Sequence, residues 1–417
     1  MGPALGILVQ KYGGSSLSQT DRLRRVSERV AASRRAGKRT VVVVSARGDT
    51  TDELLDLVED IGGRHAARRA PREVDQLLAT GEYASAALLA LALERLGVPA
   101  VSLTGAQAGI RAVGRHGDGV IDSIDTGRVT RCLDEERVVV VGGFQGLNDT
   151  GDVVTLGRGG SDTTAVALAA ALGAGSCEIY TDVDGVYTAD PRLVESARKL
   201  PHVAADVMVE MAFAGAKVLH SRSAELAAAK GVELHVRSSL VDREGTVVSG
   251  NGTSLLETGS AITAVTSDTD VARILVHCKG RSDPASEILG ILAGNAVPTD
   301  LVARSGPQED EFRMGFTVRR SDVSRIEEPL ANAVAPFDGG IRVDTDVVKV
   351  SLIGMGLLNR PEYLARLMTV LDGAGIVTSW MSSSQLRVSV VVPSRDHVRA
   401  LRLLHAEFDL AGAGILV

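Results

Sequence analysis

The sequence has few cysteines and few aromatic side chains. The first shortage limits the kinds of cross-link and metal site the chain can contain, and the second limits the composition of its cores. Its three cysteines, Cys132, Cys177 and Cys278, lie far apart along 417 residues, which indicates neither a disulfide framework nor a zinc site. The eight histidines are scattered without the spacing of metal ligands, so we expect no resident metal site. Aromatic residues make up only 3% of the chain, so its cores must consist mainly of Val, Leu, Ile and Ala.

A basic surface and a membrane segment are also missing. The net charge is −7, with no basic tail and no stripe of basic and aromatic residues, which argues against nucleic acid as a partner. No apolar run approaches the ~18 residues that a membrane span requires, and no leader is predicted before the strand at residues 7–9. We therefore expect a cytoplasmic protein without membrane partners.

The composition is that of an ordinary globular protein, 45% hydrophobic and 23% charged, in a chain long enough for two or three domains. Residues 40–44 form a continuous apolar run, which is typical of a parallel strand covered on both faces. We predict further strands at residues 6–10, 100–103, 137–141, 153–155, 177–181, 232–236 and 246–248, alternating with helices. This alternation predicts an α/β domain over residues 1–250, with a three-layer, mostly parallel sheet between helices.

Residues 153–165 predict a strand, a glycine-rich turn and the start of an apolar helix. Three glycines among residues 157–160 leave N–H groups open to an anion, and Arg158 adds a planar cation that suits a carboxylate. We expect Ser161 or Asp162 to cap the helix, and Asp162 to orient cations or a metal. An ordinary loop with a capping Asp is the alternative. A dinucleotide-binding loop is excluded because Asp162 stands where the third glycine belongs.

Other short stretches carry candidate binding residues. Lys11 ends the first strand and precedes two glycines, as a phosphate site requires, although a surface lysine before a turn is the alternative. Small hydroxyl residues within 45–52 follow the second strand, at the edge where open α/β sheets bind ligands. Glu82 is expected in the first turn of a helix over residues 80–96, where the helix dipole alone could explain its charge. Lys217 is a second lysine at a glycine-led helix end.

From residue 262 the pattern changes to two repeats of a strand–helix–strand–strand–helix unit, which we divide into residues 262–345 and 346–417. The predicted strands are 273–276, 297–303, 311–318, 348–353, 376–381, 386–392 and 414–417, and the predicted helices are 285–292, 322–334, 362–371 and 395–408. The repeat predicts two α+β domains of ferredoxin-like type. Such repeats behind an enzyme domain commonly bind effectors, and dimerisation alone is the alternative.

Taken together, these stretches resemble the aspartate kinases of the amino acid kinase family. Over residues 7–250 the resemblance rests on the segments 11–16, 45–52, 80–82, 103–109, 157–162, 180–187, 190–192 and 215–220. The repeated tail more loosely resembles the paired ACT domains of the same enzymes. The resemblance implies transfer of the ATP γ-phosphoryl group, with Mg²⁺, to the β-carboxylate of L-aspartate. Separately, we predict a homo-oligomer, at least a dimer, formed through the repeated tail, because two ferredoxin-like units expose sheet edges and one apolar face each.

The resemblance assigns a role to each candidate residue. Lys11 would stabilise the transferring phosphoryl group, Lys217 the nucleotide phosphates, and Asp162 would hold both lysines in place. The residues implied to bind aspartate are Ser45, Thr51, Glu82, Arg158 and Ser161, with Glu82 near the ammonium and Arg158 on a carboxylate. The residues implied to bind the nucleotide are Lys11, Gly13, Gly14, Ser15, Thr181, Asp182, Tyr187, Arg192 and Lys217, with Asp182 toward the ribose.

Departures from the family pattern lie in residues 45–52, which the resemblance implies to be the substrate loop, and in the ACT repeats. Arg47 stands where Met is common, so a cation beside the substrate loop is expected to alter acceptor affinity. Feedback-controlled aspartate kinases usually have Pro-Gly before each first ACT helix and Ile-Asn in the strand that follows. Here these pairs are Pro284–Ala285 with Val297–Pro298 and Pro361–Glu362 with Ile376–Val377, and Gln385 stands where Glu is frequent. We predict weakened lysine and threonine feedback, although ACT loops also vary without consequence.

Two other functions remain open at this point. One is an amino acid kinase that acts on glutamate, N-acetylglutamate or a related acid, which Glu82 disfavours because it suits a free ammonium group. The other is a catalytically silent effector sensor, which the presence of Lys11, Asp162 and Lys217 disfavours.

Overall fold

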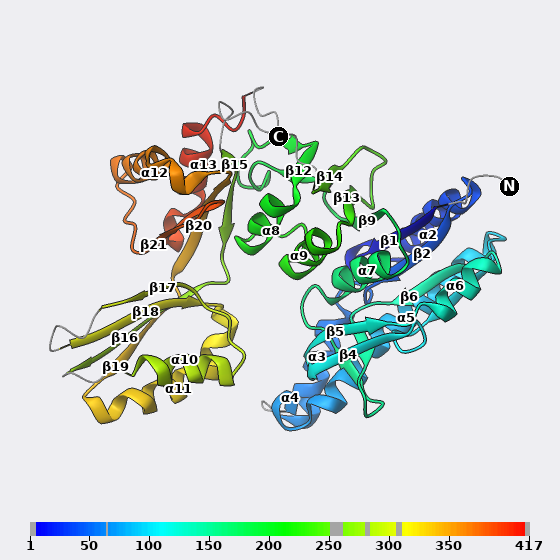
Figure 1. The fold of residues 1–417 in the computed structure, drawn as a ribbon, viewed down its shortest axis with the longest axis horizontal. Helices are drawn as coiled ribbons and strands as arrows, with labels where there is room; N and C mark the ends of the chain where they lie inside the picture. The colour runs from blue at the N-terminus through cyan, green and yellow to red at the C-terminus, as the bar shows by residue number, and fades with distance from the viewer. Residues whose placement is uncertain (1–5, 64–65, 251–261, 280–283, 306–310, 413–417) are drawn as a thin grey trace.

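The computed structural model describes residues 6–63, 66–250, 262–279, 284–305 and 311–412. Figure 1 shows one large α/β domain and two smaller α+β units that lie beside it. This division confirms the predicted fold class, because one sheet of the large domain is mostly parallel and each smaller unit has its own four-stranded sheet.

The large domain is built on an eight-stranded sheet. In spatial order its strands are β12 (His202–Ala204), β14 (Thr246–Ser249), β13 (Glu233–Ser238), β9 (Ser176–Thr181), β1 (Ile7–Tyr12), β2 (Arg39–Val44), β6 (Val138–Gly142) and β3 (Ala100–Leu103). Every neighbouring pair is parallel except β13 with β14. The predicted run at residues 40–44 is therefore a central strand with neighbours on both sides.

Helices cover both faces of this sheet. The helices of the domain are α1 (Gly14–Leu17), α2 (Thr20–Arg35), α3 (Thr50–Gly62), α4 (Ala66–Arg69), α5 (Pro71–Arg95), α6 (Gly127–Asp134), α7 (Gly160–Ala171), α8 (Ala205–Phe213) and α9 (Ser221–Lys230). Val42 and Val44 of β2 pack with the apolar residues of α2 and α5. Val41 and Val43 point the other way and pack with α7, α8 and α9. This alternation explains why the strand is apolar at every position and confirms the three layers.

One helix corrects the expectation about apolar segments. α5 is long and apolar enough to cross a membrane by length and composition alone, although half of its apolar stretch is buried in the protein. Leu89 and Leu93 of α5 are fully buried against the sheet. The helix is thus a core helix of the large domain.

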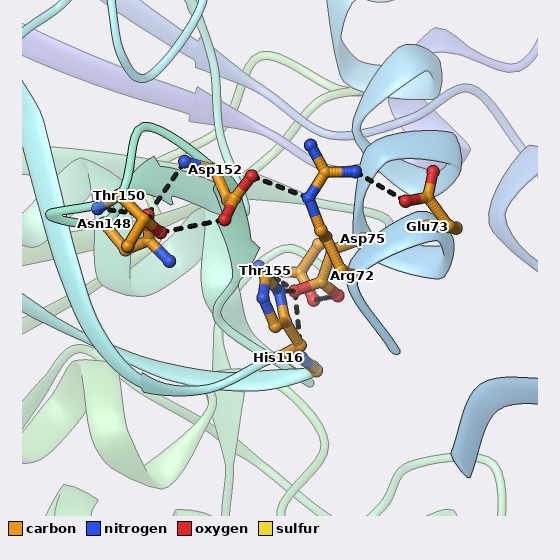
Figure 2. A network of polar contacts seen from close by, with 9 residues as sticks. Arg72, Glu73, Asp75, His116, Asn148, Thr150, Asp152 and Thr155 are labelled. Atoms are coloured by element: carbon orange, nitrogen blue, oxygen red, sulfur yellow. Dashed lines mark hydrogen bonds and ion pairs between the residues drawn. The ribbon is translucent and has the colours of Figure 1, made fainter. Parts of the chain in front are cut away.

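A smaller sheet supports the glycine-rich turn. Its strands in spatial order are β5 (Asp118–Ile124), β4 (Ile110–Arg115), β7 (Gln145–Leu147) and β8 (Val153–Thr155). Asp75 of α5 is buried and accepts hydrogen bonds from the backbone N–H and the hydroxyl of Thr155, at 2.9 and 2.6 Å, as Figure 2 shows. Nδ1 of His116 lies 2.8 Å from the same carboxylate. These hydrogen bonds attach β8, the strand that leads into the glycine-rich turn, to helix α5. A separate two-stranded ribbon pairs β10 (Val186–Tyr187) with β11 (Lys199–Leu200).

The first small unit contains β16 (Ala272–Lys279), α10 (Ala285–Gly294), β17 (Asp300–Arg304), β18 (Glu311–Val318), η1 (Arg320–Asp322), α11 (Val323–Val334), η2 (Ala335–Phe337) and β19 (Gly340–Asp344). The second contains β15 (Ile262–Asp268), β20 (Val347–Gly354), η3 (Leu357–Asn359), α12 (Pro361–Gly373), β21 (Met381–Ser383), β22 (Arg387–Pro393), η4 (Ser394–Asp396) and α13 (His397–Glu407). The sheets have the orders β17-β18-β16-β19 and β15-β20-β22-β21.

Two expectations about the tail are wrong. Residues 262–268 were expected in the first unit, but β15 pairs antiparallel with β20, so the first unit is inserted into the second. Of the strand predicted at 376–381, only its last residue is in a regular strand, because Ser379 and Trp380 make isolated backbone hydrogen bonds to Val391. The strand predicted at 414–417 lies outside the described residues.

Candidate active site

The candidate residues gather at the carboxyl ends of the parallel strands, where ligands bind in open α/β sheets. Lys11 lies near the end of β1, Ser45 directly follows β2, and Thr181 ends β9. Because β1 pairs with both β2 and β9, these three residues lie along one edge of the sheet.

Lys11 and Asp162 form an ion pair at the centre of this edge. Nζ of Lys11 lies 2.5 Å from Oδ1 of Asp162, and each side chain is only 12% exposed. The structure therefore brings these two predicted residues together. Lys217 lies in the turn after α8 and is exposed, and among the described residues no ion pair joins it to Asp162. The expectation that Asp162 holds both lysines is met here for Lys11 alone.

The glycine-rich turn enters α7 without a side-chain cap, so the predicted cap by Ser161 or Asp162 is wrong. The cap residue is Gly159, whose φ of +71° is the left-handed conformation that glycine adopts readily. A Cβ atom on Gly159 would lie 2.2 Å from Cγ of His220, so only glycine fits at this position. The N–H group of Gly160 donates to the carbonyl of Gly157 at 3.0 Å, and the glycine cap offers no side chain to the next N–H groups of α7, as suits an anion site.

Arg158 and Ser161 occupy different depths in this turn. Arg158 is exposed, and no ion pair to it is found within the described parts of the chain. Ser161 is 7% exposed and lies against Gly143, where an added Cβ would meet its Oγ at 2.9 Å. The turn thus presents a free guanidinium above a buried hydroxyl.

The loop between β2 and α3, which begins the expected substrate loop, packs its backbone against the backbone of the loop after β1. The N–H group of Gly48 donates to the carbonyl of Gly14 at 3.0 Å, and a Cβ on Gly14 would lie 2.6 Å from the carbonyl oxygen of Ala46. Arg47 donates to the carbonyls of Leu17 and Ser18, at 2.8 and 3.2 Å. Its guanidinium is thus engaged at the end of α1 and ties the two loops together, and its expected effect on acceptor affinity stays a prediction.

Glu82 lies in the middle of α5, since that helix begins at Pro71 and not at residue 80. The helix-dipole explanation for Glu82 is therefore wrong. Its side chain is buried, and Oε1 accepts the backbone N–H of Ala46 at 2.9 Å. Its Oε2 is buried and has no hydrogen-bond partner within the described residues. Burial raises the pKa of Glu82 to about 7, against the opposing effect of the Ala46 hydrogen bond.

Thr51 and the residues expected to bind nucleotide lie around this centre. Thr51 is in the first turn of α3, and Gly13 donates its N–H to the carbonyl of Tyr180 at 3.4 Å. Ser15 and Asp182 are exposed, and Asp182 accepts a hydrogen bond from the Thr181 hydroxyl at 2.9 Å.

Tyr187 and Arg192 are held by neighbouring carboxylates. The Tyr187 hydroxyl donates to Asp184 at 2.6 Å, and burial together with this bond raises the pKa of Tyr187 to about 12. Arg192 grips Asp190 with two hydrogen bonds, at 3.0 and 2.8 Å, which lower the pKa of Asp190. Both residues are thus positioned by contacts within the segment that follows β9.

Three residues near the site lie in segments that carry the resemblance but were assigned no role from the sequence. Tyr12 and Tyr180 stack with ring centroids 4.6 Å apart beneath the loop after β1. The His220 ring packs against Gly159, and burial lowers its pKa. These contacts join segments that are distant in the chain, so no local sequence pattern could have indicated them.

The metal-binding side chains and a surface cavity of the described residues can be placed relative to Lys11 and Asp162. Among the described residues no three His, Cys, Asp or Glu side chains are grouped to hold a metal ion. A surface cavity of about 530 Å³ lies behind the substrate loop and is lined by Arg47, Gly48, Thr50 and Gly81 among others. Lys11 and Asp162 do not line it, so it is distinct from the edge described above.

Comparison with known proteins agrees with this geometry. The sequence matches the amino acid kinase family over residues 6–238 and an ACT domain over residues 350–408. The aspartokinase of Corynebacterium glutamicum is 43% identical over 413 residues, which cover 98% of this chain and 97% of that protein. E. coli aspartokinase III in complex with aspartate and ADP has a similar fold, with a TM-score of 0.81 and 25% identity over 96% of this chain and 99% of that one. The same enzyme in complex with lysine and aspartate has a TM-score of 0.72, again at 25% identity, 96% coverage of this chain and 99% of that one.

Proposed function

The chain belongs to the amino acid kinase family and, within it, to the aspartate kinases, and we propose that it transfers the γ-phosphoryl group of ATP to the β-carboxylate of L-aspartate. The product would be 4-phospho-L-aspartate. The observation that carries this proposal is the Lys11–Asp162 pair on one edge of the sheet, with the buried carboxylate of Glu82 bound to the adjoining substrate loop.

Glu82 supports a free amino acid as the acceptor. Its Oε2 is buried and has no hydrogen-bond partner in the part of the chain that the structure describes, and an ionised carboxylate in that position needs a cation or a donor. The ammonium group of aspartate would supply both, whereas an N-acylated substrate has no such charge. Arg158 offers a free planar fork to a carboxylate of the substrate, and the hydroxyls of Ser45, Thr51 and Ser161 complete its polar contacts.

Charge neutralisation at the phosphoryl group is the task of the lysines. Lys11, oriented by Asp162, would stabilise charge on the transferring group, and Lys217 would stabilise the nucleotide phosphates. A β-carboxylate oxygen of aspartate forms a bond to the γ-phosphorus, and the bond from that phosphorus to the bridging oxygen breaks as ADP leaves. No proton has to move, because the acceptor carboxylate is already ionised at neutral pH.

The nucleotide would lie along the loop after β1 and the segment after β9. The N–H groups of Gly13, Gly14 and Ser15 suit phosphate oxygens, and Thr181, Asp182, Tyr187 and Arg192 suit the nucleoside side. Mg²⁺ bound to ATP would neutralise phosphate charge.

A hydroxamate assay tests the acceptor. Purified protein is incubated with Mg-ATP, hydroxylamine and, in separate reactions, aspartate, glutamate and N-acetylglutamate. We expect hydroxamate with aspartate and none above background with N-acetylglutamate, because only a free ammonium pairs with Glu82. Hydroxamate from N-acetylglutamate alone would favour the alternative amino acid kinase.

We also propose a homo-oligomer formed through the two ACT units. Their outer strands β17 and β21 expose apolar side chains at Val302 and Met381, which a second copy would cover. Light scattering at micromolar protein should give at least twice the 43.5 kDa of one chain. A monomeric mass would contradict this proposal.

Weakened feedback by lysine and threonine is a further part of the proposal. Pro298 has no N–H group, and Val377 is largely exposed but offers no side-chain hydrogen bond. Glu362 places an exposed negative charge in the first turn of α12, where a ligand carboxylate would be repelled. These features support an enzyme whose ACT units bind amino acids poorly.

A further inference from the structure

A cluster of charged side chains joins all three parts of the molecule. Asp300 begins β17 of the first ACT unit, while Lys349 and Arg387 lie on β20 and β22 of the second. Nζ of Lys349 is 3.0 Å from the Asp300 carboxylate, and Arg387 donates to the same carboxylate at 3.1 and 3.4 Å. Burial opposes ionisation of Asp300, yet the two cations hold its pKa below the ordinary value.

The same cations contact the end of helix α8 in the kinase domain. Nε of Arg387 lies 3.3 Å from Oε2 of Glu210, in an ion pair that is 11% exposed on the arginine side. Lys349 and Arg387 also lie over the ring of Phe213, at 5.1 and 4.8 Å from its centroid. Glu210 and Phe213 belong to the last turn of α8, which lies beside the second unit in Figure 1.

The turn that follows α8 carries Lys217, and the second unit holds this turn from its other side. Gly215 has a φ of +103°, and a Cβ on it would lie 2.2 Å from the carbonyl oxygen of Ser267 on β15. The turn thus contacts the charged cluster at Phe213 and β15 at Gly215, two residues before Lys217. A shift of either contact would move Lys217.

The cluster contains two positive and two negative side chains that share partners. A change in one ion pair therefore affects the others. Lys349 is 3% exposed, and a buried ammonium is tolerated only with a close counter-charge. Asp300 supplies that charge and is shared with Arg387. If β17 moves Asp300 away, both cations lose a partner, and the hold of Arg387 on Glu210 changes with it.

We propose that Arg387 is a positioning residue for phosphoryl transfer. From the second ACT unit it fixes the end of α8 and thereby places Lys217. The position of Arg387 is in turn set by Asp300 of the first ACT unit. This inference rests on the proposed role of Lys217 at the nucleotide phosphates. It identifies a route by which a displacement in either ACT unit reaches the nucleotide half of the site without any direct contact to substrate.

The test replaces Glu210 with Gln, which removes the negative charge in the last turn of α8 and leaves the Asp300–Lys349–Arg387 contacts in place. The matched control is Glu407→Gln, because Glu407 accepts from Arg366 at 2.8 Å and Arg366 lies 4.7 Å from the Phe408 centroid, within the second unit. Initial rates are measured with ATP and aspartate varied separately, and circular dichroism and thermal unfolding report whether each variant is folded.

For Glu210→Gln we expect kcat to fall about tenfold and the KM of ATP to rise, since a misplacement of ~1 Å can cost up to ~10²-fold in rate. The KM of aspartate should stay unchanged, and Glu407→Gln should match the wild type. A second variant, Phe213→Leu, keeps an apolar side chain but removes the ring from the cations, and it should shift the same two parameters in the same direction.

The double variant Glu210→Gln with Arg387→Met should be no slower than Arg387→Met alone, because both changes break the same ion pair, that between Arg387 and Glu210. A Glu210→Gln enzyme with wild-type kcat and ATP KM would overturn the inference while the kinase assignment stands. If Glu210→Gln does not fold, Phe213→Leu decides: wild-type kinetics in that variant would likewise overturn it. An inactive but folded wild-type enzyme would instead count against the proposed function.

Discussion

Oε1 of Glu82, in the middle of α5, accepts the backbone N–H of Ala46 in the substrate loop at 2.9 Å. The bond uses one oxygen of a buried carboxylate and leaves the other without a described partner. A residue that packs in the hydrophobic layer between helix and sheet therefore also fixes the loop that carries Ser45, and directs a titratable oxygen toward the proposed substrate.

Aspartate capture should depend on the ionisation of Glu82. Because burial raises the pKa of Glu82 to about 7, the free enzyme is only partly ionised at neutral pH, and the substrate ammonium pairs with the ionised form. We expect kcat/KM for aspartate to rise with pH through about 7. The measurement is a pH profile of kcat/KM between pH 5.5 and ~8.5, the range that brackets this ionisation.

Glu82→Gln is the control for that profile, and it should remove the rise along with much of the aspartate affinity.

The pH dependence of stability gives an independent check on Glu82. The folded chain keeps a proton on Glu82 that the unfolded chain releases near pH 4.5, so the free energy of unfolding contributed by Glu82 falls as the pH rises from 4.5 to about 7. Glu82→Gln should flatten this slope. An unchanged slope would mean that Glu82 is not the group that titrates.

Lys11→Ala and Lys217→Ala should lose activity mainly in kcat, because both charges act on phosphoryl groups. Removal of one preorganised charge typically costs ~10²–10³ in rate. Arg158→Lys is the contrasting variant: it should raise the KM of aspartate and leave kcat nearly intact, since a point charge cannot replace a bidentate fork. Near-normal kcat in either lysine variant would show that its assigned role is wrong, and steady-state kinetics with each substrate varied gives the answer.

Feedback inhibition should be weak or absent. Lysine, threonine and methionine are titrated singly and in pairs against the initial rate, and we expect no half-inhibition at or below ~1 mM, which corresponds to only ~4 kcal/mol of binding. As a matched gain-of-function control, Pro298→Asn with Val377→Asn restores a side-chain hydrogen bond in each unit and should increase inhibition. Half-inhibition of the unaltered enzyme by lysine plus threonine at or below ~1 mM would contradict the proposal.

Local chemistry made much of the site predictable. Lys11 before two glycines and Asp162 after three are short-range patterns, and their ion pair joins the end of β1 to the first turn of α7. The predicted strands of the large domain are recovered, and its central ones are long apolar runs that have few other structures available in the middle of a parallel sheet.

The errors have tertiary causes. α5 was expected to begin near residue 80, but it begins at Pro71 and Gly81 lies inside it. A Cβ on Gly81 would lie 2.9 Å from Cβ of Ala46, so the glycine permits close packing there. Pro71 was the signal that was overlooked, since proline is favoured in the first helical turn. The pairing of β15 with β20 joins residues that a repeat pattern separates, and only the assembled sheet decides it.

The central claim is that the β-carboxylate oxygen of aspartate forms the new bond to the γ-phosphorus, and isotope transfer measures it most directly. Aspartate carrying heavy oxygen in its β-carboxylate is phosphorylated with Mg-ATP and trapped with hydroxylamine, which attacks the acyl carbon and releases phosphate. We predict that the released phosphate carries one heavy oxygen, and that label placed in the α-carboxylate never reaches it. Unlabelled phosphate, or no aspartyl hydroxamate at any aspartate concentration, would contradict the claim.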